Sequence, residues 1–125
     1  MQEYYREYEK KCERQWVFMR QLEKKIILWA EQQNCSFHRI DFFPHGDGEI
    51  VKYAKSLEIY VFYRKNKELT EYQANGIAEK TKDEIKRILA ELGYFKEFSE
   101  DIRFEFDTHE NVKKNYKGSY FYRFR

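Results

Sequence analysis

A long amphipathic helix at the start of the chain limits the possible folds more than any other feature. From Gln2 to Gln33, apolar residues recur at steps of three or four, and Glu, Lys and Arg fill most positions between them. This spacing predicts an α-helix with one apolar stripe that packs against another layer. Asn34 can end the helix, because asparagine tolerates the left-handed backbone of a cap. The helix would be about 48 Å long, so we expect its first turns to project beyond the core. The stripe consists of Tyr5, Tyr8, Cys12, Trp16, Met19, Leu22, Ile26 and Trp29.

Two strands are expected after this helix. The segment Cys35–Phe43 is predicted to be a strand that ends at Pro44. The segment Leu57–Arg64 is rich in Tyr, Val, Ile and Phe, which favour strands. Apolar residues occupy both faces of this second strand, so we expect it to lie in the centre of the sheet. Between the two strands, His45–Gly48 predicts a turn, whereas residues 50–54 fit a strand or a loop.

A capping box predicts where a second helix begins. Thr70 can accept a hydrogen bond from the backbone three residues later, where Gln73 can reach back to the cap. Apolar residues then recur at helical spacing as far as Leu92, and Gly93 can supply the left-handed residue that ends the helix.

Two further strands are predicted near the C-terminus. Asp101–Asp107 and Ser119–Arg125 both alternate in character, and the polar segment Thr108–Gly118 is expected to join them as a hairpin loop. The predicted order is therefore α-β-β-α-β-β. It indicates a two-layer α+β fold, with a mainly antiparallel four-stranded sheet and two helices on one face. The length of 125 residues is typical of a single domain, here residues 1–125.

Large aromatic residues are expected to build much of the core. Charged residues make up 37% of the chain, but the sequence also contains 11 Tyr, 11 Phe and 2 Trp. Each such ring can bury about 150–250 Å², so a few positions can stabilise the fold. We expect Trp16 and Ile85, one from each helix, to be buried anchors.

Charge and cysteine content argue against several classes of protein. The 24 basic and 22 acidic residues give a net charge of +2, too balanced to indicate nucleic-acid binding by bulk electrostatics. The N-terminal sequence has no apolar signal-peptide core, and no stretch approaches the ~20 apolar residues that span a bilayer. Cys12 and Cys35 form no Cys-x-x-Cys motif, so they are expected to be reduced and buried rather than a disulfide or zinc site. These features predict a cytoplasmic protein with no cofactor and no metal.

One face of the predicted sheet is expected to remain open, because the helices cover the other. Strand parity turns aromatic rings, arginines and carboxylates toward it, and aromatic residues and arginine are enriched at protein interfaces. Cross-strand pairs on a solvated sheet, or a homodimer contact, would give the same pattern. The outward residues are Phe37, Arg39, Asp41, Phe43, Glu58, Tyr60, Phe62, Arg64, Arg103, Glu105, Asp107, Phe121, Arg123 and Arg125. Those predicted to bind a partner are Tyr60, Phe62, Arg103, Glu105, Phe121 and Arg123.

The function favoured by these patterns is non-enzymatic protein binding. The expected protein is a small bacterial immunity or inhibitor protein, a monomer or weak homodimer without a membrane partner, which masks a toxin or nuclease. Carboxylates on the open face would attract a cationic protein surface and repel a phosphate backbone. The sequence contains no glycine-rich phosphate loop and no Gly-x-Ser-x-Gly motif.

Two alternatives remain open. One is a nucleic-acid-binding module that uses the same face together with the lysines of the 108–118 loop. The other is a small enzyme that uses His38 or His45 with Asp41 or Asp47. The glycines on either side of Asp47 are, however, typical of a turn. The histidines and carboxylates also lack the sequence spacing of a known metal-binding motif.

Overall fold

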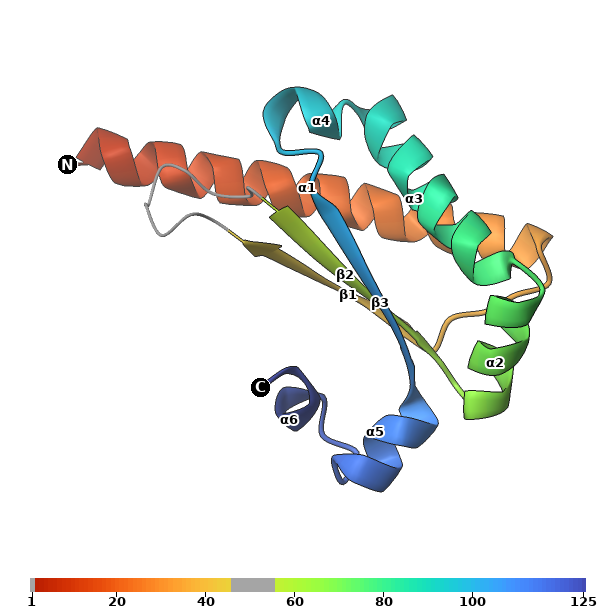
Figure 1. Cartoon of the computed structure of the whole chain (residues 1–125). Coiled ribbons are helices and arrows are strands. Elements are labelled where there is room, and N and C mark those ends of the chain that lie inside the picture. The colour runs from red at the N-terminus through yellow and green to blue at the C-terminus, as the bar shows by residue number, and fades with distance from the viewer. Residues whose placement is uncertain (1, 46–55) are drawn as a thin grey trace.

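Three strands form one sheet, and helices lie on both of its faces (Figure 1). The structure, a computed structural model, describes residues 2–45 and 56–125. The helix α1 runs along one face beside α3, whereas α5 and α6 lie on the other side (Figure 1). The elements are α1 (Gln2–Gln32), β1 (Arg39–His45), β2 (Ser56–Tyr63), α2 (Asn66–Ala74), α3 (Ile77–Leu92), α4 (Tyr94–Glu97), β3 (Ile102–Thr108), α5 (His109–Asn115) and α6 (Tyr120–Phe124).

Strand β2 lies between β1 and β3, as its two apolar faces predicted. It pairs antiparallel with β1 and parallel with β3, so that Tyr60 lies opposite Asp41 on one side and Glu105 on the other. The α+β class is confirmed, but the predicted four-stranded, mainly antiparallel sheet is wrong. The reason is that α2, α3 and α4 carry the chain back to the end of the sheet at which β2 begins. Strand β3 therefore runs parallel to β2. The regular alternation in β3 reflects one exposed face of an edge strand and does not determine strand direction.

The predicted strand Asp101–Asp107 is confirmed as β3, but the predicted C-terminal hairpin is wrong, because its loop contains α5 and its second strand, Ser119–Arg125, contains α6. Thr108 begins α5 by accepting a hydrogen bond from the backbone N–H of Asn111 (3.0 Å), and Ser119 begins α6 by accepting one from Tyr122 (3.2 Å). Between the helices, Gly118 has a φ of 78° and donates its N–H to the carbonyl of Val112. The segment Thr108–Gly118 is therefore not a loop. In α6, Tyr120 and Phe124 lie on one side, as residues four apart on a helix do.

Strand β1 begins and ends later than predicted. The segment Cys35–Phe43 was expected to end at Pro44, but the strand is Arg39–His45 and includes the proline. Proline is tolerated because β1 is an edge strand, where one row of N–H groups has no partner in the sheet. Most of the predicted His45–Gly48 turn and the whole ambiguous segment 50–54 lie outside the described residues.

The predicted second helix consists of two helices, and Thr70 does not begin it. Helix α2 begins four residues earlier, and the Thr70 hydroxyl donates to the carbonyl of Asn66 (3.1 Å) from inside the helix. The break comes at Asn75 and Gly76, where the glycine has a φ of 86° and the Asn75 side chain accepts from the N–H of Ile77. The predicted ends at Asn34 and Gly93 are confirmed, with φ values of 56° and 86°.

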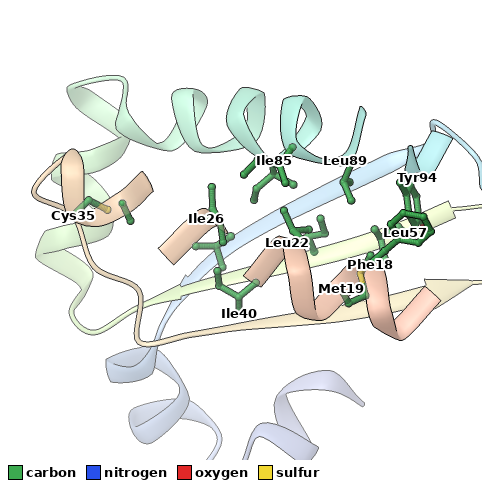
Figure 2. Close-up of a cluster of buried hydrophobic side chains, with 14 of the residues drawn as sticks. Phe18, Met19, Leu22, Ile26, Cys35, Ile40, Leu57, Ile85, Leu89 and Tyr94 are labelled. Carbon is green, nitrogen blue, oxygen red and sulfur yellow. The ribbon is translucent and has the colours of Figure 1, made fainter. Parts of the chain in front are cut away.

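The core lies between the sheet and the pair α1 and α3. Figure 2 shows Leu22 and Ile26 of α1 between Ile85 of α3 and the sheet. The prediction for Ile85 is confirmed, because its side chain is fully buried, but Trp16 is 47% exposed. The apolar stripe of α1 is rotated from the one predicted, and the side chains of Tyr5, Tyr8 and Cys12 lie outside the described residues. The buried residues of α1 are Gln15, Phe18, Met19, Leu22, Ile26 and Ala30.

Helix α1 extends well past the sheet, as its predicted length implied. Its first turns reach beyond the ends of the strands (Figure 1). At the inner end of this region, the Gln15 amide donates to the hydroxyl of Tyr94 in α4 (3.0 Å), and both residues are buried. This hydrogen bond replaces the hydrogen bonds to water that the two polar groups lose when they are buried, and it fixes α4 against α1.

Replacing the two expected anchors should separate the buried residue from the exposed one. We expect Ile85→Ala to lower the free energy of unfolding by about 2–5 kcal/mol, because it leaves a cavity in the core. We expect Trp16→Ala to cost about 1 kcal/mol or less, because its ring is half exposed. Urea unfolding followed by circular dichroism measures both changes. Equal losses in the two variants would contradict the rotated stripe of α1.

Candidate functional site

The face of the sheet opposite α1 and α3, here called the distal face, contains most of the residues predicted to bind a partner. Strand parity was correct for β2 and β3, since Tyr60, Phe62, Arg103 and Glu105 are all on this face. Phe37 is an exception, because it precedes β1 and packs on the core beside Tyr63. The expectation that this face is open is wrong in part, because α6 covers its centre.

An aromatic cluster attaches α6 to the distal face. The ring of Phe124 lies 4.8 Å from Phe43, 5.1 Å from Tyr60 and 5.8 Å from Phe62, centroid to centroid. The Tyr120 ring packs edge to face on Phe62 at 5.0 Å. Such geometries are preferred by aromatic pairs. Phe62 is fully buried as a result, so this predicted binding residue cannot contact a partner unless α6 detaches.

An ion-pair clamp fixes the same helix. The Arg123 guanidinium donates to Asp107 (2.6 Å) and to Glu105 (3.0 Å) on β3. Burial alone lowers the pKa of Arg123, but the hydrogen bonds to the two carboxylates outweigh it and raise the pKa above its ordinary value. The side chains of Arg123 and Asp107 are only 13% and 12% exposed. Arg123 therefore holds α6 in place, and little of it remains for a partner.

Asp107 is the centre of a polar network that the sequence analysis did not identify as such. Its carboxylate accepts hydrogen bonds from the Asn111 amide (3.0 and 3.1 Å) and from the backbone N–H of Thr108 (2.7 Å), in addition to Arg123. The Thr108 hydroxyl in turn bonds the Asn66 side chain at the start of α2. This network connects β3, α5, α6 and α2 around one buried carboxylate.

Three of the predicted binding residues surround a small cavity, here called the acidic cavity. It has a volume of about 210 Å³, and Glu58 and Glu105 are among the residues that line it. The Tyr60 hydroxyl donates to Glu58 (3.0 Å), and Arg103 pairs with Asp101 (3.2 Å) at the rim. Burial, the hydrogen bond to Glu58 and the two carboxylate charges raise the pKa of Tyr60. The charges of Glu58 and Glu105, which are secondary to burial in raising this pKa, favour a positively charged group in the cavity, whereas the charge of Arg123 acts in the opposite direction. The lining consists of Glu58, Tyr60, Arg103, Phe104 and Glu105.

The outer side of α6 presents aromatic rings to solvent. Phe121 is 72% exposed and Tyr122 is 52% exposed, with their centroids 5.7 Å apart. The Arg125 guanidinium lies about 6 Å from both rings. Because Arg123 of the same helix is bound to Glu105 and Asp107 of β3, the helix that carries this exposed pair is fixed on the sheet.

The residues of the predicted enzyme site are occupied in other contacts. The Asp41 carboxylate forms two hydrogen bonds of 2.7 Å with Arg39, whose guanidinium also lies 3.8 Å above the Tyr120 ring. His38 stacks on His109 at 4.1 Å, and His109 bonds the Tyr120 hydroxyl through Nδ1 (2.8 Å). Among the described side chains, the hydrogen bonds of Asp41 are to Arg39 and that of His109 is to Tyr120, so none joins His38 to Asp41. Asp47 and the side chain of His45 lie outside the described residues.

The Cys35 thiol is buried in the core. Cys35 is 4% exposed, and burial raises the pKa of its thiol to about 11. The thiolate, which is the reactive form, is therefore scarce at neutral pH. Among the side chains that the structure describes, no group of three or more from His, Cys, Asp or Glu is arranged to hold a metal ion.

The sequence does contain a signal for the residues that were missed, namely the two helix N-caps that precede them. Asn111 in α5, and Tyr120 and Phe124 in α6, follow Thr108 and Ser119, and both of these residues are good N-caps. Glu110 in the first turn of α5 and lysines in its last turn also match the charge preference of a helix.

Comparison of the chain with protein-family models, curated proteins and solved structures gave no match. Among the described helices, none combines the length and apolar character required to cross a membrane.

Removing the clamp should release α6. We expect Arg123→Gln to lower the free energy of unfolding by about 2–3 kcal/mol, because it takes a charged partner from the buried Asp107. Arg103→Gln is the control, since it breaks an exposed pair with Asp101 and should cost about 0.5 kcal/mol or less. Hydrogen exchange should also show faster exchange in α6 for Arg123→Gln alone. Unchanged α6 protection would contradict the clamp.

The environment of His38 predicts the sign of a pH effect. Burial, and then the charges of His109, Arg64 and Arg39, lower its pKa below the ordinary 6.5. The unfolded chain therefore takes up this proton at a higher pH than the folded protein does. Stability associated with His38 is complete above about pH 6.5 and falls as the pH drops toward the folded pKa. NMR titration should give a His38 pKa below 6.5, and His38→Gln should reduce the loss of stability. A pKa at or above 6.5 would refute this account.

Proposed function

We propose that this chain is a non-enzymatic protein-binding domain, and that its partner inserts a lysine or arginine side chain into the acidic cavity. The partner would also contact the exposed rings of Phe121 and Tyr122 on α6. The masked surface would be cationic, as is the active-site cleft of a nuclease, so we propose an inhibitor or immunity protein that acts by occlusion. Such masking requires no chemistry from this chain.

The acidic cavity is the observation that supports this proposal most directly. Two carboxylates, Glu58 and Glu105, lie around one small cavity with the ring of Tyr60. A cation that enters it would find carboxylate oxygens that can accept charge-assisted hydrogen bonds. Because Glu105 uses Oε1 for Arg123 and is 53% exposed on its side chain, its other oxygen can face an incoming donor.

The exposed aromatic pair supports the same surface. Aromatic residues and arginine dominate the binding energy of protein interfaces, most of all where they are held rigidly before the partner arrives. Phe121 and Tyr122 are held on a helix whose opposite side is fixed by the Arg123 clamp and the ring of Phe124. Phe121 and Tyr122 would then lose little conformational entropy when a partner binds.

The same details disfavour nucleic acid on the distal face. Base stacking would require accessible rings on the sheet, but Phe62 is buried under α6. Arg123 is bound to two carboxylates instead of facing outward. A phosphate backbone close to Glu58 and Glu105 would be repelled by their charges.

Site-specific cross-linking in the producing cell tests the surface before the partner is known. A photoreactive phenylalanine analogue replaces Phe121 in one protein and Leu28 in another. Leu28 is a matched control, because it is 59% exposed on α1, on the other side of the sheet. We expect one discrete protein adduct from position 121 and none of that mass from position 28. An adduct with nucleic acid at position 121, or the same adducts from both positions, would contradict the proposal.

Affinity for the identified partner then tests the cavity. We expect Glu105→Gln and Phe121→Ala each to weaken binding by about 1–3 kcal/mol, as truncation at the centre of an interface does. Glu23→Gln and Leu28→Ala on α1 are controls and should change it by no more than about 0.5 kcal/mol. The Glu105→Gln loss should shrink at high salt, because it removes an ionic contact. Equal effects of the control variants would refute the acidic cavity as the contact.

A further inference from the structure

A second, larger cavity lies at the junction of β2, α2 and α5 and has the opposite charge. Its volume is about 560 Å³, within the range of sites that hold small molecules. Arg64 and Lys65 come from the turn between β2 and α2, and the other residues lie on one side of α5, at spacings of one, four and five. We call it the basic cavity. Its lining consists of Arg64, Lys65, His109, Glu110, Lys113 and Lys114.

The cations of the basic cavity are not neutralised within the described part of the chain. None of the ion pairs there involves Arg64, Lys65, Lys113 or Lys114. The one carboxylate in the lining, Glu110, accepts a hydrogen bond from the backbone N–H of Asn66 (2.8 Å) at the start of α2. Four positive charges therefore gather around one cavity with a single negative charge.

Folding alone explains only half of this cluster. Lys113 and Lys114 lie in the last turn of α5, where positive charge stabilises a helix. Lys65 is the N-cap of α2, with Arg64 before it, and a helix N-terminus disfavours positive charge. A lysine side chain cannot accept the hydrogen bond that good N-cap residues accept. A residue that opposes local stability in this way is typical of a functional site.

We propose that the basic cavity binds the phosphate groups of a nucleotide or of a nucleic-acid strand, independently of the protein partner of the distal face. Three lysine ammonium groups and the Arg64 guanidinium can contact phosphate oxygens as charge-assisted donors, and the guanidinium can do so with two parallel hydrogen bonds. The cavity volume exceeds what a single inorganic phosphate requires, which leaves room for a larger phosphorylated ligand.

Positive charges of the basic cavity also act on the neighbouring His38. Its ring stacks on His109 of the cavity, and the charges of His109, Arg64 and Arg39 add to burial in lowering its pKa. The potential that disfavours a proton on His38 favours an anion in the adjoining cavity. This effect is opposite in sign to that at Tyr60 in the acidic cavity, where carboxylates raise the pKa.

Titration with two phosphate sources tests the proposal on the full chain. The probes are a fluorescent single-stranded oligouridylate and ATP without metal, each measured over a series of salt concentrations. The test variant is Lys113→Gln with Lys114→Gln, and Arg64→Gln provides a second variant that leaves α5 unchanged. The matched control is Lys24→Gln with Lys25→Gln, an adjacent pair of exposed lysines on α1. Circular dichroism checks that every variant is folded.

We expect the wild type and the α1 control to bind at least one probe equally well. The double variant on α5 should bind it at least about tenfold more weakly at low salt, and Arg64→Gln should also weaken it. For the RNA probe, losing two contacts should reduce the slope of log affinity against log salt by about 1.4. Binding of RNA alone identifies a strand as the ligand, whereas binding of ATP alone identifies a nucleotide.

Two results would overturn the proposal. One is that the wild type binds neither probe at low salt. The other is that the α1 control loses as much affinity as the α5 variant, which would show that lysines anywhere on the surface are sufficient. The cross-linking from position 121 is a separate measurement, so the failure of one proposal leaves the other standing.

Discussion

Strand β2 has large apolar side chains on both faces, and both faces must be covered for the sheet to be stable in water. Leu57, Ile59 and Val61 are fully buried under α1 and α3. Phe62 is equally buried on the distal face, under Tyr120 and Phe124. The residues after β3 must therefore fold back over the sheet, and the Arg123 clamp fixes where they do so. The positions of both cavities depend on this requirement.

Covering the distal face with α5 and α6 separates opposite charges. Arg123 neutralises Asp107 and partly neutralises Glu105, so the buried carboxylate does not face solvent. The acidic cavity remains over β2 and β3, on which Glu58 and Glu105 lie. The lysines of α5 lie at the other end of β3, beside the start of α2. A chain with a net charge of only +2 can in this way present two surfaces of opposite potential, which bulk charge cannot reveal.

The sequence predicted the elements whose patterns are local and failed where two structures share one pattern. Only one local structure is compatible with the helical period of α1, with the two apolar faces of β2, or with the helix ends at Asn34 and Gly93. The segment after Gly118 is compatible with two, because aromatic residues that alternate along a strand also include a pair at i and i+4 on a helix. Ser119 as N-cap decides between them, and it selects the helix. The direction of β3 depends on the crossover through α2, α3 and α4, which no pattern within β3 records.

Some of the predicted binding residues were placed correctly and others were not, and the difference again depends on whether the deciding interaction is local in sequence. Parity along a strand is local, so Tyr60, Arg103 and Glu105 were placed correctly and surround one cavity. What covers a strand is not local, so Phe62 and Arg123 were expected at the surface and are bound under or to α6. The basic cavity combines residues about 45 positions apart in the chain. In the sequence alone, its lysines and arginine cannot be distinguished from ordinary solvent-exposed charged residues. Only the fold shows that Lys65 occupies a helix N-terminus, where its charge opposes local stability and is better explained by an anionic ligand.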